Sequence, residues 1–135
     1  MKSPFYAILL TLFSVIASAQ NKDFQLSTHI LDVSKGIPAP DVIIRLEKFN
    51  QHSKLWVYVD EKITDSNGRV SNFLPSSHPN TGIYKLIFLT SDYFKKSKTD
   101  SFYPFIEVVF EIKDQNHYHV PITLSPYGYS TYRGS

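Results

Sequence analysis

The chain has 135 residues, with 14 lysine and arginine residues against 12 acidic residues, a formal net charge of +2 and no cysteine. A charge this close to neutral argues against a nucleic-acid-binding protein that depends on many phosphate contacts. The lack of cysteine excludes disulfides and a thiolate nucleophile, so packing or oligomerisation must stabilise the domain.

Residues 1–19 have the segment order of a cleaved secretory signal peptide. A lysine near the start precedes an apolar run that ends at Ile16, and small residues stand at Ala17 and Ala19. The alternative is a membrane anchor, but the run is shorter than the roughly 20 residues that a spanning helix needs. We predict cleavage after Ala19. Residues 20–135 are then one exported domain, periplasmic if the host is bacterial, with no further membrane contact.

The mature chain is predicted to form short β-strands separated by turns, because no segment holds a long 3.6-residue period. One-sided strands are predicted where apolar and polar residues alternate, in residues 24–33, 42–49, 105–114 and 117–124. A further strand is expected at 54–59, and residues 82–90, apolar on both faces, are typical of a central strand. About seven or eight strands in all predict an all-β, two-sheet antiparallel sandwich.

Two local signals complete the predicted fold. In the sequence TDSNGR, Asn67 and Gly68 are expected to supply the positive φ angles of a tight turn. Residues 91–100 are the helical candidate, with Ser91 as a possible N-cap and lysines toward the end, where they suit a helix C-terminus.

Strand parity singles out two histidines from opposite ends of the mature chain. His29 and His119 both fall on the face opposite their strand's core-packing residues. Two imidazoles on one surface could provide a general base and a partner, and an arginine beside them could bind an oxygen-rich anion. Arg69 and Arg45 compete for that role. Two further histidines, His52 and His78, lie in polar loops and are assigned none.

Other chemistries are less well supported by the residues. His117 and His119 point the same way but make only half of a tetrahedral zinc site, so no metal is predicted. No G-x-S-x-G motif supports a serine hydrolase, and Ser125, Ser130 and Ser135 have no assignable base. The acidic residues lie mostly in turns or on outward strand faces, where they solubilise the surface, rather than as an opposed glycosidase pair.

Several segments in the same order resemble the transthyretin-related 5-hydroxyisourate hydrolases. They are STHILDVSKGIPAPDVIIRLEK, TDSNGR, SDYFKK followed by SFYPFIEVVF, and HYHVPITLSPYGYSTYRGS. The terminal YRGS is the most specific of these marks, since transthyretin, the hormone carrier of the same fold, lacks it. The resemblance implies a transthyretin-like sandwich that hydrolyses 5-hydroxyisourate to 2-oxo-4-hydroxy-4-carboxy-5-ureidoimidazoline without a cofactor. The segment from Phe49 to Ile63 fits no part of that pattern.

The resemblance also implies site residues and an assembly. Catalytic roles fall on His29, Arg69 and His119. Substrate binding falls on His29 and Arg69 together with the last four residues, which are Tyr132, Arg133, Gly134 and Ser135. A homotetramer with active sites in a channel between subunits is implied, and would explain why these histidines face away from the core of their own chain.

Two other functions remain open on the sequence. A transthyretin-like carrier would hold a small aromatic ligand in the channel without converting it. An exported structural or adhesion domain would need neither His29 nor His119. Fold alone does not separate these functions.

Overall fold

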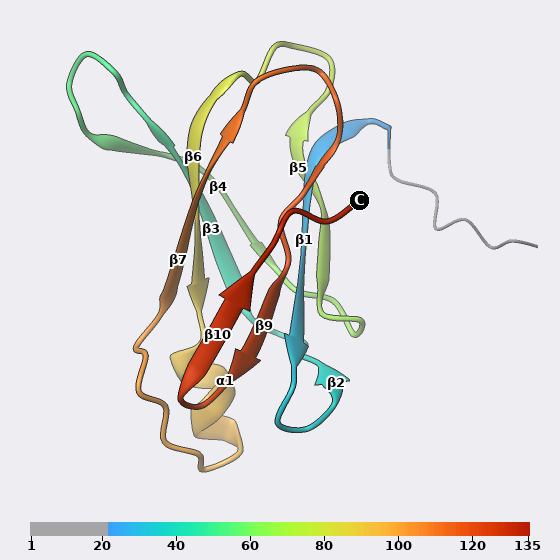
Figure 1. Cartoon of the computed structure of the whole chain (residues 1–135), viewed down its shortest axis with the longest axis vertical. Coiled ribbons are helices and arrows are strands. Elements are labelled where there is room, and N and C mark those ends of the chain that lie inside the picture. The colour runs from blue at the N-terminus through green and yellow to red at the C-terminus, as the bar shows by residue number, and fades with distance from the viewer. Residues whose placement is uncertain (1–21) are drawn as a thin grey trace, which may run out of the picture.

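Residues 22–135 are described by the structure, a computed structural model, and form two facing β-sheets with one helix at an end of the sandwich (Figure 1). The strands are β1 (Phe24–Asp32), β2 (Ile37–Pro38), β3 (Ile43–Phe49), β4 (Trp56–Ile63), β5 (Arg69–Pro75), β6 (Gly82–Leu89), β7 (Ile106–Ile112), β8 (Tyr118–His119), β9 (Ile122–Ser125) and β10 (Gly128–Thr131), and the helix is α1 (Ser91–Lys96). The predicted all-β sandwich with one short helix is confirmed. The predicted signal peptide lies outside the described residues.

The first sheet is organised around β1. Its order is β10-β9-β1-β2, and β5 and β8 also pair with β1, whereas the second sheet has the order β4-β3-β6-β7. Most neighbours are antiparallel, but β1 runs parallel to both β8 and β9. Alternation within one strand carries no information about the direction of its neighbour, so the sequence pattern could not reveal this junction. It matters because it brings the two ends of the domain together.

The core lies between the sheets and follows the predicted alternation. Fully buried side chains come from both layers, with Leu26 and Ile30 on β1 facing Leu46 on β3 and Leu86 on β6. On the returning strands the four apolar residues of one face, Tyr118, Val120, Ile122 and Leu124, are also buried. The opposite faces of β1 and β8 are therefore available for a site, as parity predicted.

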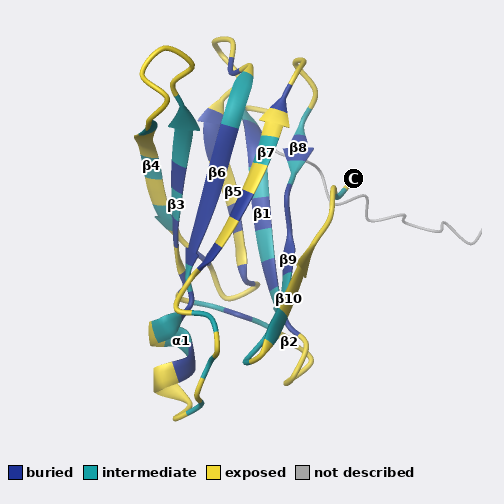
Figure 2. Cartoon of the chain, turned by 60° about the vertical axis from the view of Figure 1, so that its left-hand side comes forward, coloured by how far each residue is buried: buried dark blue, intermediate teal, exposed yellow. Residues whose placement is uncertain are grey.

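Strand β6 is the central strand that its composition predicted, and Figure 2 shows it buried along most of its length. Lys85 is the exception in that run, and it is buried on the outer face. Its Nζ lies 3.7 Å from Oε1 of Glu47, 3.5 Å from Oε1 of Glu107 and 4.5 Å from the centre of the Trp56 ring. Paired carboxylates and an aromatic face offset the desolvation of this ammonium group.

Helix α1 caps one end of the sandwich and is tied to β1. The predicted N-cap at Ser91 is wrong: Thr90 is the N-cap residue, and Ser91 begins the helix with its hydroxyl donating to the carbonyl of Pro104 at 2.5 Å. The Tyr93 hydroxyl donates to Oδ2 of Asp32 at 2.6 Å. Among residues 22–135 no helix is long and apolar enough to cross a membrane.

Asp32→Ala is expected to lower the free energy of unfolding by about 3 kcal/mol, because the buried carboxylate accepts hydrogen bonds from Ser34, Lys35 and Tyr93 that alanine leaves unmade. Urea denaturation measures the change. Tyr93→Phe removes one of these bonds and should cost about half as much. Equal stability of Asp32→Ala and the parent chain would contradict this reading of the contact.

Candidate active site

The turn that leads into β5 places Arg69 beside His29. His29 and Arg69 are register partners across β1 and β5. Oδ1 of Asp65 accepts hydrogen bonds from the backbone N–H groups of Asn67 at 2.9 Å and Arg69 at 3.0 Å, which closes the turn. Of Asn67 and Gly68, only Gly68 has a positive φ, +70°, so the prediction that both turn residues have one is wrong. The Asp65 side chain shapes the turn that Asn67 was expected to shape.

Gly68 is required at this position for two reasons. Its φ favours glycine, and a Cβ built on it would lie 2.7 Å from the carbonyl oxygen of Ile30. The two backbones approach this closely because the Ile30 N–H donates to the Gly68 carbonyl at 2.9 Å. The turn is therefore seated on β1 directly after His29, which fixes the register of His29 with Arg69.

The parallel pairing of β8 with β1 brings His119 to the same place. Ser27 and His119 are register partners, and the Val120 N–H donates to the Ser27 carbonyl at 3.0 Å. The predicted strand over residues 117–124 is two strands, β8 and β9, because Pro121 has no N–H to continue the ladder. His119 thus lies next to the segment of β1 that carries His29.

The C-terminal residues fold back onto His119. Strand β10 pairs with β9 and returns the chain toward β8, and the chain ends beside β8 (Figure 2). The Gly134 N–H donates to the His119 carbonyl at 2.9 Å. A Cβ on Gly134 would lie 2.4 Å from Cδ2 of the His119 ring, so only glycine allows this contact. Residues 128–131 thus form strand β10, and the last four residues, the tail, are bridged through Gly134 to the predicted catalytic residue His119.

The other terminal residues take different positions. The guanidinium carbon of Arg133 lies 4.7 Å from the centre of the Tyr118 ring, which holds the tail against β8. Tyr132 is 57% exposed, and Ser135 is exposed as well. In the single chain, Gly134 contacts His119, Arg133 anchors the tail, and the side chains of Tyr132 and Ser135 face outward.

Both imidazoles are held neutral at pH 7. Burial, and then the positive charge of Arg69, lower the pKa of His29 below its ordinary value of 6.5. A hydrogen bond with the backbone of Asn67 acts in the opposite direction and raises this pKa. Burial and then Arg69, with smaller contributions from His29 and His117, lower the pKa of His119 to about 4. A neutral imidazole can accept a proton, so the pair is suited to general-base chemistry.

Two polar residues near His119 were not singled out as site residues. Oγ of Ser27 lies 2.8 Å from Nε2 of His117 and 2.7 Å from Nδ1 of His119. The alternation of side chains along a strand could have identified both residues, because Ser27 shares a strand face with His29 and His117 shares one with His119. Among residues 22–135 no group of three or more His, Asp or Glu side chains is placed to bind a metal.

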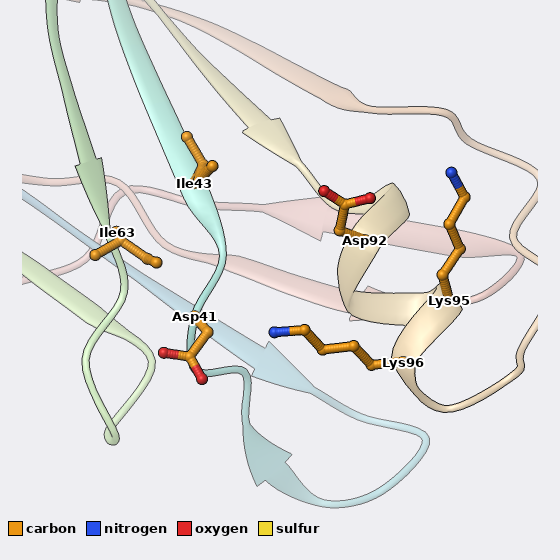
Figure 3. A pocket seen from close by; sticks show the side chains of 6 residues that line it. All are labelled: Asp41, Ile43, Ile63, Asp92, Lys95 and Lys96. Carbon is orange, nitrogen blue, oxygen red and sulfur yellow. The ribbon is translucent and has the colours of Figure 1, made fainter.

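Arg45 does not lie near this cluster. It belongs to β3 in the second sheet, where its Nε donates to Oε1 of Glu61 at 3.3 Å. A shallow surface hollow beside α1 also contains none of the predicted site residues; Figure 3 shows its lining, which is Asp41, Ile43, Ile63, Asp92, Lys95 and Lys96. Arg69 is thus the arginine whose charge acts on both histidines.

Arg69→Gln is expected to raise the pKa of His29 and His119, because it removes the positive charge that disfavours each imidazolium. NMR titration of the ring protons measures both values. His119 should titrate near pH 4 in the parent chain and at a higher pH in the variant, still below 6.5 because burial, the larger cause of the lowered pKa, remains. Arg45→Gln is the matched control and should change neither value. Unchanged titration in Arg69→Gln would show that the guanidinium does not act on this pair.

Residues 26–134 match the family model described as the HIUase/Transthyretin family. The chain belongs to this family. Among its relatives, a probable 5-hydroxyisourate hydrolase of Caenorhabditis elegans is 42% identical over 134 residues, covering 98% of this chain and 97% of the relative. The 5-hydroxyisourate hydrolase of Salmonella typhimurium is 46% identical over 111 residues, covering 82% of this chain and 80% of the relative.

Solved structures of the HIUase/Transthyretin family share the fold. The 5-hydroxyisourate hydrolase of Klebsiella pneumoniae is 34% identical with a TM-score of 0.69, covering 82% of this chain and 98% of that one. Sea bream transthyretin in complex with thyroxine is 28% identical with a TM-score of 0.76, covering 82% and 94%. A hydrolase and a protein that binds thyroxine thus have this architecture, and the site residues must separate the two functions.

Proposed function

We propose that the chain hydrolyses 5-hydroxyisourate to 2-oxo-4-hydroxy-4-carboxy-5-ureidoimidazoline in the breakdown of urate. The observation that carries the proposal is the meeting of His29, Arg69 and His119 on one face of the first sheet, with Gly134 against the His119 ring. This arrangement occurs in a chain 40–46% identical to the 5-hydroxyisourate hydrolases of several organisms. No cofactor is needed for the reaction.

The proposed mechanism is attack of water on a ring carbonyl. The product carries a carboxyl and a ureido group, so the bond that breaks joins that carbonyl carbon to a ring nitrogen. The two neutral imidazoles position the water and take its proton as the carbon becomes tetrahedral. Arg69 binds the ureide edge and stabilises the oxyanion, and the nitrogen leaves with a proton.

A carrier function is the main alternative, because transthyretin has the same fold. The site chemistry favours the hydrolase. A carrier of a flat ligand has no use for two imidazoles whose pKa is depressed by an adjacent guanidinium. A structural or adhesion domain has no use for them either, so it would lose nothing but stability on their replacement.

Turnover separates the hydrolase from the carrier. The untagged mature chain is added at one-hundredth of the concentration of freshly generated 5-hydroxyisourate, and the ultraviolet absorbance of the substrate is followed beside its spontaneous decay. A hydrolase consumes many substrate molecules per chain and accelerates the whole decay. A carrier at this ratio leaves the decay unchanged, and that outcome would overturn the proposal.

The proposed assembly is a homotetramer whose sites line a channel between subunits. Strands β7 and β10 end their sheets, each with one neighbour in the described chain, and Figure 2 shows both with exposed residues. The loops that precede these two strands adjoin, because the Phe102 N–H donates to the Pro126 carbonyl at 2.8 Å. Large exposed side chains flank them, with Phe102 and Tyr127 each 71% exposed. Such edges favour pairing with another chain.

Sedimentation equilibrium tests the assembly. It should give the mass of four chains, and the mass of a monomer would contradict the proposed tetramer.

The proposed location is outside the cytoplasm, in the periplasm if the host is bacterial. The support is the segment order of residues 1–19. Expression of the full chain in a secreting host, followed by N-terminal sequencing, should give a protein that begins at Gln20. Recovery of the exported protein with its first 19 residues intact would contradict cleavage.

A further inference from the structure

A chain of three hydrogen bonds runs from the backbone of β1 through two side chains to His119. Nδ1 of His117 lies 3.0 Å from the carbonyl oxygen of Phe24, and Nε2 of His117 lies 2.8 Å from Oγ of Ser27. The same Oγ lies 2.7 Å from Nδ1 of His119. The proposed mechanism uses neither Ser27 nor His117, although both are tied to its predicted base.

The proton positions follow from what each atom can do. The Phe24 carbonyl can only accept, so Nδ1 of His117 must donate to it. In a neutral imidazole the other nitrogen is then an acceptor, so the Ser27 hydroxyl donates its one proton to Nε2 of His117. With that proton committed, Oγ of Ser27 can only accept from His119. The proton of a neutral His119 therefore lies on Nδ1.

We propose that Ser27 and His117 are positioning residues that fix the tautomer of His119, with the proton on Nδ1 and the lone pair on Nε2. The inference rests on the proposed hydrolysis and deepens it, because it names the atom of His119 that takes the proton from water. Nε2 is bonded to Cδ2, the ring atom against which Gly134 packs, so the lone pair lies on the side of the ring away from the Ser27 hydroxyl.

The chain of hydrogen bonds and the C-terminal tail hold opposite sides of the His119 ring. Ser27 binds His119 at Nδ1, and Gly134 limits the ring at Cδ2. An imidazole released from Ser27 could carry its proton on either nitrogen, and the tautomer with Nε2–H has no lone pair with which to accept a proton from water there. The charged and titratable groups acting on His119 are Arg69, His29 and His117. Of these, His117 belongs to the hydrogen-bond chain itself.

The direct test is the tautomer of His119 in the ¹⁵N-labelled protein at pH 7, read from the long-range nitrogen–proton couplings of the ring. We expect Nδ1–H in the parent chain, and a mixture or Nε2–H in Ser27→Ala and His117→Ala. Ser27→Thr keeps the hydroxyl and should keep the tautomer. His78→Ala is the matched control, because His78 lies in an exposed turn outside the chain of bonds.

Kinetics on 5-hydroxyisourate provide the second readout. Ser27→Ala and His117→Ala should lower kcat by about 10- to 100-fold, less than loss of a general base, while KM changes by less than about twofold. Ser27→Thr should keep most of the parental kcat.

An Nε2–H tautomer of His119 in the parent chain would overturn the inference, and this measurement does not depend on whether any variant folds. So would full kcat in both alanine variants. A parent chain that holds Nδ1–H but does not accelerate the decay would refute the proposed hydrolysis and leave the tautomer assignment standing.

Discussion

His119→Ala is expected to lower kcat/KM for 5-hydroxyisourate by about 100- to 10,000-fold, the contribution of a positioned general base. The substitution removes the imidazole whose pKa is lowered to about 4 and which therefore stays neutral at pH 7. It also removes the ring that Ser27 and Gly134 hold from two sides. The measurement is the initial rate of absorbance loss over a range of substrate concentrations.

The stability of the same variant must be measured alongside. His119 is only partly buried, so His119→Ala should cost about 1 kcal/mol of unfolding free energy, too little to unfold the domain. His78→Ala is the control and should have parental activity. A folded His119→Ala variant with parental kcat/KM would remove His119 from the mechanism.

Gly134→Ala is expected to lower kcat by about 100-fold with little change in stability. Its Cβ would lie 2.4 Å from Cδ2 of His119, well inside contact distance, so either the ring or the tail must move. A shift of about 1 Å in a catalytic group can cost about 100-fold in rate. The backbone of Gly134 has no positive φ, so the effect would arise from the contact and not from strain.

Gly128→Ala is the matched control for this substitution. Gly128 also lies in the C-terminal segment, but a Cβ there would meet only Oγ of Ser125, at 3.6 Å. It should keep parental activity. A chain that ends at Thr131 should lose activity as Gly134→Ala does, because it lacks the bridge from Gly134 to His119. Full activity in both altered chains would show that the terminal residues serve assembly or folding alone.

The sequence predicted the parts of the fold that depend on burial. Alternation placed Leu26 and Ile30 inside, and the structure confirms both. The same parity placed His29 and His119 on outward faces, so the histidine pair could be named before any contact was known. Burial governs which residues fill the core, and it leaves a pattern of period two that can be read directly.

Details that depend on hydrogen bonds between distant residues were not predicted. The Ser91 hydroxyl, which was expected to cap helix α1, instead donates to the carbonyl of Pro104, 13 residues further along the chain. The contact of Gly134 with His119 needs the parallel junction of β1 with β8 and the return of β10. These features depend on neighbours that only the folded chain supplies.

The relation between the fold and the proposed chemistry is tested most directly by the pH dependence of kcat/KM for 5-hydroxyisourate with the untagged mature chain. A base must be neutral, and its pKa is depressed, so activity is present above that pKa and is lost only as pH falls through it. We predict acceleration over spontaneous decay at pH 7 and an acid limb well below 6.5, the ordinary value for histidine. Arg69→Gln should move that limb upward. No acceleration at any pH, or an acid limb at 6.5 or above in the parent chain, would contradict the account.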